Sequence, residues 1–210
     1  MTILLEQIRK FSPESLSFLE IQDERDLLIA ERIYSRGVPI LKCGITYIQG
    51  DFNTTTDSGK FVPREELLNK GYTNSIDGIW RLKGSPDALP LYEGHMVGLL
   101  QFSKKGYVSG RARAAKWRII SRDESVLEPQ YLVMENDSRL LGTLGKPGVS
   151  FINVTSSTNT RTTIVTLSPP FPHNHSTPRF LIEFFHQRLP EIFLRAGRKR
   201  CPIWTQLSLS

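Results

Sequence analysis

Short apolar runs rich in β-branched residues alternate with turn-forming residues through most of this chain. Between Leu41 and Leu167 these runs are four to six residues long, and clusters of Gly, Pro, Asn and Asp separate them. Runs of this length and composition are typical of β-strands, because a core helix needs roughly ten or more residues. The pattern predicts an irregular α+β fold that is mainly β. The expected strands are Ile45–Ile48, Ile79–Leu82, Lys116–Ile120, Gln130–Val133, Val149–Val154 and Thr162–Leu167.

The first 45 residues have a different pattern, which predicts an extended linker followed by a helix. Asp23 is a good N-cap, the run Glu24–Tyr34 carries Leu and Ile at helical spacing, and Gly37 is a stop signal. Residues 46–172 are then expected to form the β-rich domain. Within it, residues 83–90 predict a loop, and Gly94–Phe102 is either a short strand or a turn.

The last segment, residues 173–210, changes character again. It follows a proline-rich loop, and Phe180–Leu194 predicts a helix that Pro190 interrupts. A basic cluster between Arg195 and Arg200 precedes a polar end, which is either a disordered tail or a phosphate-binding extension.

Composition restricts the compartment and the partner. Apolar residues make up 39% of the 210 residues, enough for a sizeable core. No basic leader and no apolar stretch of about 20 residues is found, so we expect a soluble, cytoplasmic protein without a membrane partner. Cys43 and Cys201 match no zinc or redox spacing, which suits a reducing compartment. The formal net charge of +6 favours a polyanionic partner.

The positive charge is concentrated in one segment, Gln101–Arg122, here called the basic segment. It holds seven cationic residues and no acidic residue, with Tyr107 and Trp117 interleaved. Arg and Lys suit phosphates and guanine edges, so the segment is a candidate DNA-binding surface; the alternative is a solvated basic face. The candidate contacts here are Lys104, Lys105, Arg111, Arg113, Lys116 and Arg118.

A second polar run, Asn153–Arg161, supplies two more candidates. Asn159 suits adenine edges and Arg161 suits guanine edges or phosphates. A β-hairpin tip with these residues could enter the major groove of a duplex, although a solvated turn has the same composition.

Signatures of several enzyme classes are missing. No phosphate-binding Gly-x4-Gly-Lys-Ser/Thr loop occurs, and no Glu has Lys two positions later, as metal-dependent nucleases commonly do. His173 and His175 form a His-x-His pair without an acidic or Cys partner, so we expect no metal site.

One motif resembles a catalytic loop. Ser168-Pro-Pro-Phe171 matches the Asp/Asn/Ser-Pro-Pro-aromatic loop of amino-methylating DNA methyltransferases, in which the aromatic ring stacks on the flipped base. The glycine-rich turn for the methyl donor has no equivalent in the chain, so we expect neither catalytic nor cofactor-binding residues here. The alternative interpretation is structural: the two prolines end a β-strand at the edge of the domain's sheet.

Four motifs, read in order, carry a resemblance over about residues 10–172. The first motif combines Ser12-Pro-Glu-Ser-Leu16 with Glu31-Arg-Ile-Tyr34 further along the chain. The second motif is Asp51-Phe-Asn-Thr-Thr-Thr-Asp57-Ser58. The other two are Leu89-Pro-Leu-Tyr-Glu-Gly-His-Met-Val97 and Ser157-Thr-Asn-Thr-Arg-Thr162. Together they resemble the target-recognition region of large adenine-specific DNA methyltransferases, found in single-chain restriction-modification enzymes and related phage-defence methyltransferases.

The resemblance implies a function in DNA recognition. Such a region binds double-stranded DNA and selects the site, while a methyltransferase catalytic domain, in the same gene or a neighbouring one, uses S-adenosylmethionine to methylate adenine. It also implies that Tyr92, Glu93 and Gly94 form a structural turn that positions the DNA contacts. We expect Glu93 to avoid phosphate, or to pair with an arginine of the basic segment.

The chain departs from the family pattern at several places. His95 stands where the family has Lys, Asn153 stands where it usually has Arg, and the sequence after Pro178 has no counterpart. We therefore expect a separate specificity part or a fragment that lacks the catalytic domain. Two rivals stay open: a small autonomous methyltransferase that uses Ser168–Phe171, and a protein-docking module of a defence enzyme.

Overall fold

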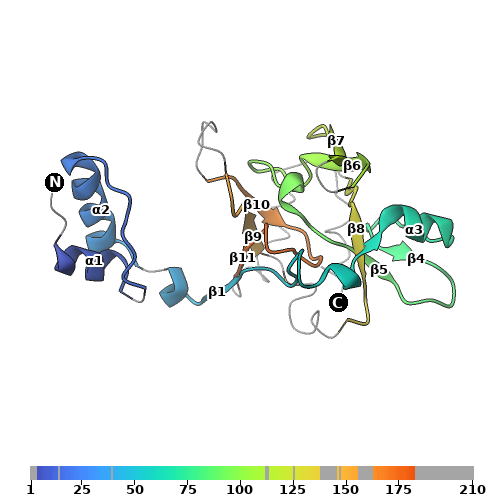
Figure 1. Cartoon of the computed structure of the whole chain (residues 1–210), viewed down its shortest axis with the longest axis horizontal. Helices are drawn as coiled ribbons and strands as arrows, with labels where there is room; N and C mark the ends of the chain where they lie inside the picture. Colours follow the sequence, from blue (N-terminus) through green and yellow to red (C-terminus); the bar gives the residue numbers. More distant parts are fainter. Residues whose placement is uncertain are drawn as a thin grey trace. The chain divides into compact units, whose positions relative to one another are not determined.

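The computed structural model of the chain has two compact units, divided between Gly44 and Ile45 (Figure 1). The described residues are 4–13, 15–38, 40–111, 114–124, 126–137, 146, 148–155 and 163–182.

The first unit is a pair of helices, α1 (Leu5–Phe11) and α2 (Glu24–Arg36), followed by the 3-10 turn η1 (Ile40–Cys43). The Asp23 carboxylate caps α2 by accepting a hydrogen bond from the Asp26 N–H at 2.9 Å. Helix α2 ends at Gly37, whose N–H donates to the Ile33 carbonyl. The expected helix and both of its end signals are confirmed, whereas the extended linker expected before it is wrong over Leu5–Phe11, which form helix α1 with Ile8 and Phe11 buried.

The second unit consists mainly of antiparallel β-sheet, which confirms the expected fold class. A four-stranded sheet has the order β1-β11-β9-β10, a five-stranded sheet has the order β2-β8-β5-β4-β3, and β6 and β7 form a separate two-stranded sheet. The strands are β1 (Ile45–Ile48), β2 (Val62–Pro63), β3 (Thr73–Asn74), β4 (Trp80–Arg81), β5 (Ala88–Pro90), β6 (Lys105–Ser109), β7 (Lys116–Ile119), β8 (Tyr131–Met134), β9 (Gly148–Phe151), β10 (Val165–Ser168) and β11 (Arg179–Ile182).

Helical turns in this unit are short. They are η2 (Ser58–Lys60), α3 (Arg64–Asn69) and η3 (Gly94–Met96). Between β3 and β4 the chain reverses through Gly78, whose φ of +82° is accessible to Gly at little cost. A Cβ at Gly78 would lie 3.2 Å from the Phe171 ring, so this turn also closes onto the core.

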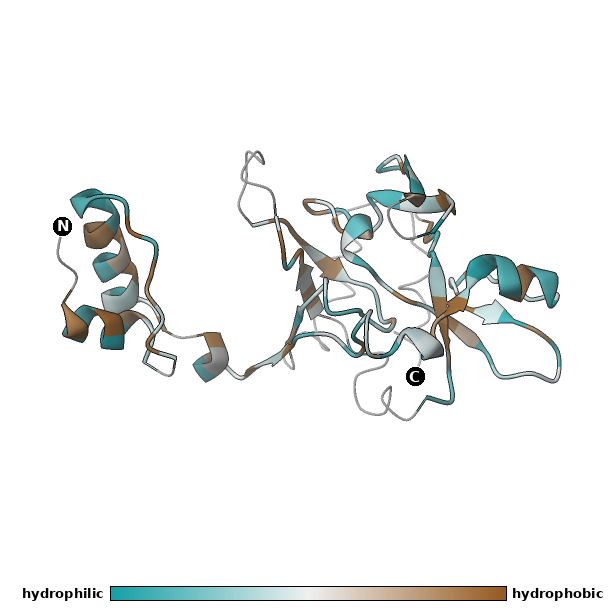
Figure 2. Ribbon diagram, in the orientation of Figure 1, coloured by the Kyte–Doolittle hydropathy of each residue, from teal (hydrophilic) through white to brown (hydrophobic). Residues whose placement is uncertain are grey.

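The core is built around β5, which the sequence pattern wrongly predicts as part of a loop over residues 83–90. All three residues of β5 are buried between β4 and β8. Ala88 packs with Leu67, Tyr72 and Trp80, whereas Leu89 joins a second cluster with Phe52. In Figure 2 the ribbon is brown where β5 and β8 pair.

The expected helix over Phe180–Leu194 is also wrong in its described part, since residues up to Ile182 belong to β11. This strand pairs with β1 on one side and β9 on the other. Sheet pairing on both edges satisfies the backbone of β11 and overrides its local helical pattern. The remaining residues of that prediction lie outside the described part of the chain. The segment Gly94–Phe102 is neither a full strand nor a simple turn, since η3 is followed by an isolated bridge between Gly98 and Gln101.

Candidate nucleic-acid interface

Most of the basic segment forms an antiparallel hairpin, here called the ribbon, made of Lys104, β6, β7 and the described residues between the two strands. Lys105 pairs with Ile119, Gly106 with Arg118 and Tyr107 with Trp117, and an irregularity lies between Tyr107 and Ser109. Gly110 follows β6 with a φ of +88°, and Ala114 donates to the Arg111 carbonyl at 3.0 Å. The ribbon thus brings residues 105 and 119 side by side at its base and places Arg111 in its connection.

One face of the ribbon rests on aromatic side chains. Tyr107 and Trp117 meet edge to face at 5.8 Å, and the His95 ring stacks on the Trp117 indole at 4.8 Å with an interplanar angle of 10°. Trp117 also packs against the buried cluster that contains Tyr92, Met96 and Phe171. These contacts fix the ribbon to the body of the unit.

Arg64, the first residue of α3, holds the same face through its guanidinium group. It donates to the carbonyls of Tyr107 at 3.0 Å and Val108 at 3.2 Å, and it lies 5.0 Å from the centre of the Tyr107 ring. The Tyr107 hydroxyl in turn donates to the Gly110 carbonyl at 2.5 Å. Arg64 lies outside the basic segment, so counting charges along the sequence could not identify it as an anchor.

The opposite face carries an ion pair that engages Arg118, one of the predicted DNA contacts. Arg118 donates to both carboxylate oxygens of Glu128 at 2.7 Å and to Glu124 at 3.0 Å. These carboxylates raise the pKa of Arg118, and Arg118 lowers the pKa of Glu124. The guanidinium fork is already occupied, so we leave Arg118 out of the proposed contact set.

Four more cations belong to the ribbon, apart from Arg122, which follows it and donates to the Leu99 carbonyl. Lys104, Arg111 and Lys116 are exposed and Lys105 is half-buried. Among the residues that the structure describes, no carboxylate lies within 4.0 Å of any of these four. Exposed apolar side chains accompany them, since Val108 is 47% exposed and Ile119 is 78% exposed. The ribbon therefore presents unpaired cations next to apolar surface.

Tyr92, Glu93 and Gly94 lie beside the start of the ribbon. Tyr92 is fully buried, and its hydroxyl donates to the Phe102 carbonyl at 2.5 Å. Shortly after the turn, the Met96 carbonyl accepts a hydrogen bond from the Lys104 N–H at 2.7 Å. The Gly94 N–H donates to the Ser176 hydroxyl at 2.9 Å. This turn therefore fixes the residues that lead into β6.

Glu93 is buried in this turn and is not exposed towards a phosphate. Its Oε2 atom has no hydrogen-bond partner, and burial raises the pKa of the carboxyl to about 7. Among the described cations none lies within ion-pair distance of Glu93, so the expected pairing with an arginine of the basic segment is not observed.

Three predicted contacts, Arg113, Asn159 and Arg161, lie outside the described residues. The structure therefore brings together Lys104, Lys105, Arg111 and Lys116 on the ribbon and says nothing of these three.

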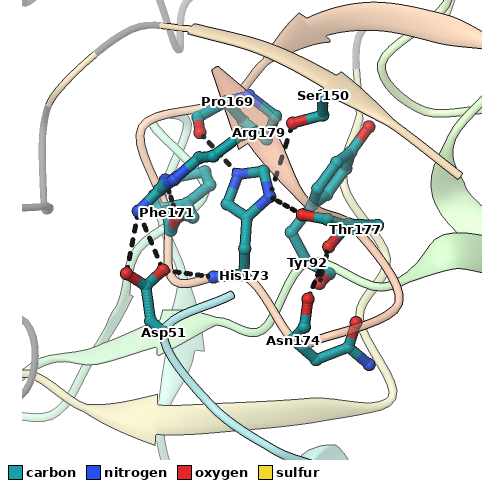
Figure 3. Close-up of polar contacts among 9 residues, drawn as sticks. All are labelled: Asp51, Tyr92, Ser150, Pro169, Phe171, His173, Asn174, Thr177 and Arg179. Atoms are coloured by element: carbon teal, nitrogen blue, oxygen red, sulfur yellow. Dashed lines mark hydrogen bonds and ion pairs between the residues drawn. The ribbon is translucent and has the colours of Figure 1, made fainter. Parts of the chain in front are cut away.

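A buried polar network holds the loop between β10 and β11 (Figure 3). Arg179 and Asp51 form a two-pronged ion pair at 2.9 Å, with side chains 0% and 1% exposed. Arg179 also donates to the Phe171 carbonyl, and Asp51 accepts from the His173 N–H at 2.8 Å. Because these contacts join residues 51, 171, 173 and 179, they fix the chain on which Gly94 and the turn rest.

The two histidines of the His-x-His pair contact different segments. His173 is fully buried next to the carbonyls of Thr177 and Pro169, and burial together with the Arg179 charge lowers its pKa to about 3. The His175 ring contacts Thr54 at 3.2 Å. Within the described ranges, no group of three or more His, Cys, Asp or Glu side chains could hold a metal ion.

Ser168 and Phe171 are also buried. Strand β10 ends at Ser168, whose hydroxyl is buried without a partner, and Phe171 belongs to the core cluster with Tyr92 and Met96. Neither side chain is accessible to a nucleobase in this conformation, which favours the interpretation of the motif as a stop at the end of a sheet.

Comparisons with protein-family models, with curated proteins and with solved structures found no match to this chain. In the part of the chain that the structure describes, no helix has the length and apolar character needed to cross a membrane.

Proposed function

We propose that this chain binds double-stranded DNA through the β6–β7 ribbon, as the target-recognition part of an adenine-specific DNA methyltransferase of a restriction-modification or phage-defence system. The observation that carries the DNA-binding part is the ribbon itself. Its exposed Lys104, Arg111 and Lys116 have no carboxylate partner among the described residues, while Arg64 and Trp117 fix the ribbon to the rest of the unit.

The dimensions of the ribbon suit a duplex. The major groove of B-DNA is about 12 Å wide and admits a two-stranded β-ribbon. Neighbouring strands lie about 4.8 Å apart, which leaves room for side chains on both edges. Arg111 in the connection, together with Lys104 and Lys116, is then suited to neutralise phosphates of the duplex.

The apolar side chains next to the cations support contact with bases as well as phosphates. Val108 and Ile119 are exposed on the same two strands. The C5-methyl group of thymine is the apolar feature of the major groove, so aliphatic side chains at this position can contribute to recognition.

The assignment to adenine methylation rests on the four sequence motifs and their order. In this proposal the chain supplies site selection in the cytoplasm, and a catalytic domain in the same gene or a neighbouring one supplies S-adenosylmethionine binding and methyl transfer. We therefore expect the isolated chain to bind duplex DNA and to give no calorimetric signal with S-adenosylmethionine.

The location of the interface can be tested with two double variants of equal charge. Arg111→Ala with Lys116→Ala removes two cations from the ribbon, whereas Lys70→Ala with Lys83→Ala removes two exposed cations elsewhere. Fluorescence anisotropy with a labelled random duplex should show a loss of about tenfold or more for the ribbon variant, and its slope of log K against log salt should fall by about two units. The control should stay near the wild-type chain.

Equal losses in the two double variants would show that only net charge matters and would remove the ribbon from the proposal. Saturable binding of S-adenosylmethionine would instead favour an autonomous methyltransferase.

A further inference from the structure

The turn Gly98–Gln101 holds a leucine in a backbone conformation that leucine rarely adopts. Leu100 has a φ of +53°, in the left-handed region that favours Gly and Asn. Among the described residues, Leu16 is the one other non-glycine residue with a positive φ. The Leu100 side chain is also 77% exposed, so burial of its apolar surface does not offset the cost of this conformation.

Hydrogen bonds on several sides hold this turn in place. Gly98 and Gln101 exchange backbone hydrogen bonds at 2.9 and 3.2 Å. The Leu100 N–H donates to the Val165 carbonyl on β10 at 2.8 Å, and the Gln101 side-chain amide donates to the Ile120 carbonyl, just after β7, at 3.0 Å. The turn is therefore a fixed support that keeps the Leu100 side chain exposed next to the base of the ribbon.

Two cations lie against the same turn. A Cβ built on Gly98 would lie 2.9 Å from the Lys104 Cβ, and the Arg122 guanidinium donates to the Leu99 carbonyl at 3.5 Å. Both cations are exposed, and among the described carboxylates none lies within 4.0 Å of either. The turn therefore combines one exposed apolar side chain with two cations that can bind phosphate.

Exposure of Leu100 alone needs no explanation, since single apolar side chains are common on protein surfaces. Its backbone conformation does, because Gly or Asn at this position would adopt the same φ at a lower cost. Strained backbone of this kind is concentrated at binding and catalytic sites. The combination of strained backbone and exposed leucine therefore points to a role of the side chain outside the fold.

We infer that Leu100 is a wedge that inserts between neighbouring base pairs of the bound duplex, while Lys104 and Arg122 bind phosphates beside it. This inference rests on the proposed DNA-binding function and extends it. Proteins that deform DNA frequently insert an aliphatic or aromatic side chain into a base step, which unstacks the step and kinks the duplex. Such a side chain needs a fixed backbone behind it and cations beside it, and this turn provides both.

The wedge predicts which duplexes the chain prefers. Unstacking costs least where a base is mismatched, and it costs less at flexible pyrimidine–purine steps than in stiff A-tracts. Contacts to phosphates alone do not depend on the stability of the base stack. In an adenine-specific methyltransferase, unstacking beside the target would also ease extrusion of the adenine.

Substitutions at Leu100 separate the wedge from the turn that carries it. Leu100→Asn removes the apolar side chain and introduces a residue that tolerates the observed φ, whereas Leu100→Met keeps an apolar side chain. Ile76→Asn is the matched control, since Ile76 is 80% exposed in a turn outside the ribbon. Both positions are exposed, so circular dichroism should show folded proteins, and Leu100→Asn should melt no lower than the unmodified chain.

The probe is a duplex of about 20 base pairs with one central T·T mismatch and 2-aminopurine next to it, compared with the same duplex fully paired. The unmodified chain and Ile76→Asn should bind the mismatched duplex about fivefold more tightly or better, and should raise the 2-aminopurine fluorescence, because stacking quenches it. Leu100→Met should retain most of both effects. Leu100→Asn should bind both duplexes equally and leave the fluorescence unchanged, with an unchanged salt slope, because Leu100 neutralises no phosphate.

Two results would overturn the inference and leave the proposed function intact. One is salt-sensitive binding in which Leu100→Asn keeps the preference for the mismatched duplex, and the other is binding of the unmodified chain without a rise in 2-aminopurine fluorescence. Binding to anionic phospholipid vesicles that Leu100→Asn abolishes would assign the side chain to a membrane surface. Absence of salt-sensitive binding to either duplex would remove the proposed function, and this inference with it.

Discussion

Arg118 and Glu128 form a two-hydrogen-bond ion pair across the bare backbone of Gly106. Gly106 is the cross-strand neighbour of Arg118 in the ribbon, and a Cβ on it would lie 2.8 Å from the Glu128 Cβ and closer still to the carboxylate. The missing side chain is therefore what allows Glu128 to reach Arg118. This pair neutralises one cation of the basic segment and leaves the others available.

Gly106→Ala should consequently displace Glu128 and separate it from Arg118. Overpacking of this kind costs about 1–3 kcal/mol, which urea denaturation can measure. Gly59→Ala is a matched control, since nothing lies within 4 Å of a Cβ there. Equal stability of Gly106→Ala and the control would show that the ribbon can move aside and that the close contact is not required.

Arg64→Ala should loosen the ribbon without removing a DNA contact. The variant loses both hydrogen bonds to the carbonyls of Tyr107 and Val108 and the contact with the Tyr107 ring. Hydrogen exchange of the ribbon amides should accelerate about tenfold, corresponding to roughly 1.4 kcal/mol. Duplex affinity should fall while the salt slope stays unchanged, because a positioning residue neutralises no phosphate. A reduced slope would instead make Arg64 a phosphate contact.

Asp51→Ala should be far more destabilising than loss of a surface ion pair. It leaves Arg179 charged and buried, and removing one partner of a buried pair costs about 3–5 kcal/mol. Lys70→Ala breaks the exposed pair with Glu66 and should cost less than about 1 kcal/mol. The difference in free energy of unfolding between the two variants is the measurement. A loss below about 1 kcal/mol for Asp51→Ala would show that water reaches Arg179.

Glu93→Gln should change how stability depends on pH. Burial raises the pKa of Glu93 from 4.5 to about 7, so between these values the folded chain holds a proton that the unfolded chain has released. Stability therefore falls as pH rises through this window, by about 3 kcal/mol. Glu93→Gln cannot ionise, so it should match the wild-type chain near pH 4.5 and be more stable at pH 8.

His173 acts in the opposite direction. Its pKa is lowered to about 3, so the unfolded chain binds an extra proton below about pH 6.5 and stability falls with acidification. This contribution is common to the wild-type chain and to Glu93→Gln, and their difference isolates Glu93. A difference in stability that stays constant from pH 4.5 to 8 would contradict the assignment of a raised pKa.

Local patterns predict the parts of the fold that local physics controls. The Asp23 cap, the Gly37 stop and strand β1 follow from helix capping and β-branched composition. Strand β5 does not emerge from the local pattern, because a three-residue strand that follows Pro86 and ends in Pro90 has the composition of a loop. The local pattern predicts a helix from Phe180, whereas these residues belong to β11, because the pairing partners β1 and β9 are remote in sequence.

In the candidate site, too, features that are local in sequence are predictable, whereas contacts between remote residues are not. The charge of the basic segment is visible in the sequence, whereas the neutralisation of Arg118 depends on Glu124 and Glu128, which follow the segment and fold back onto it. The contact between Arg64 and Tyr107 and the pair of Asp51 with Arg179 span 43 and 128 residues. No pattern within a single sequence reveals separations of this size.

The salt dependence of duplex binding by the unmodified chain tests the central proposal most directly. With Lys104, Arg111 and Lys116 each neutralising a phosphate, log K should fall linearly with log salt with a slope of about −3. Contributions from Lys105 would make the slope steeper. Absence of saturable binding at low salt, or binding that salt does not weaken, would contradict DNA recognition by the ribbon.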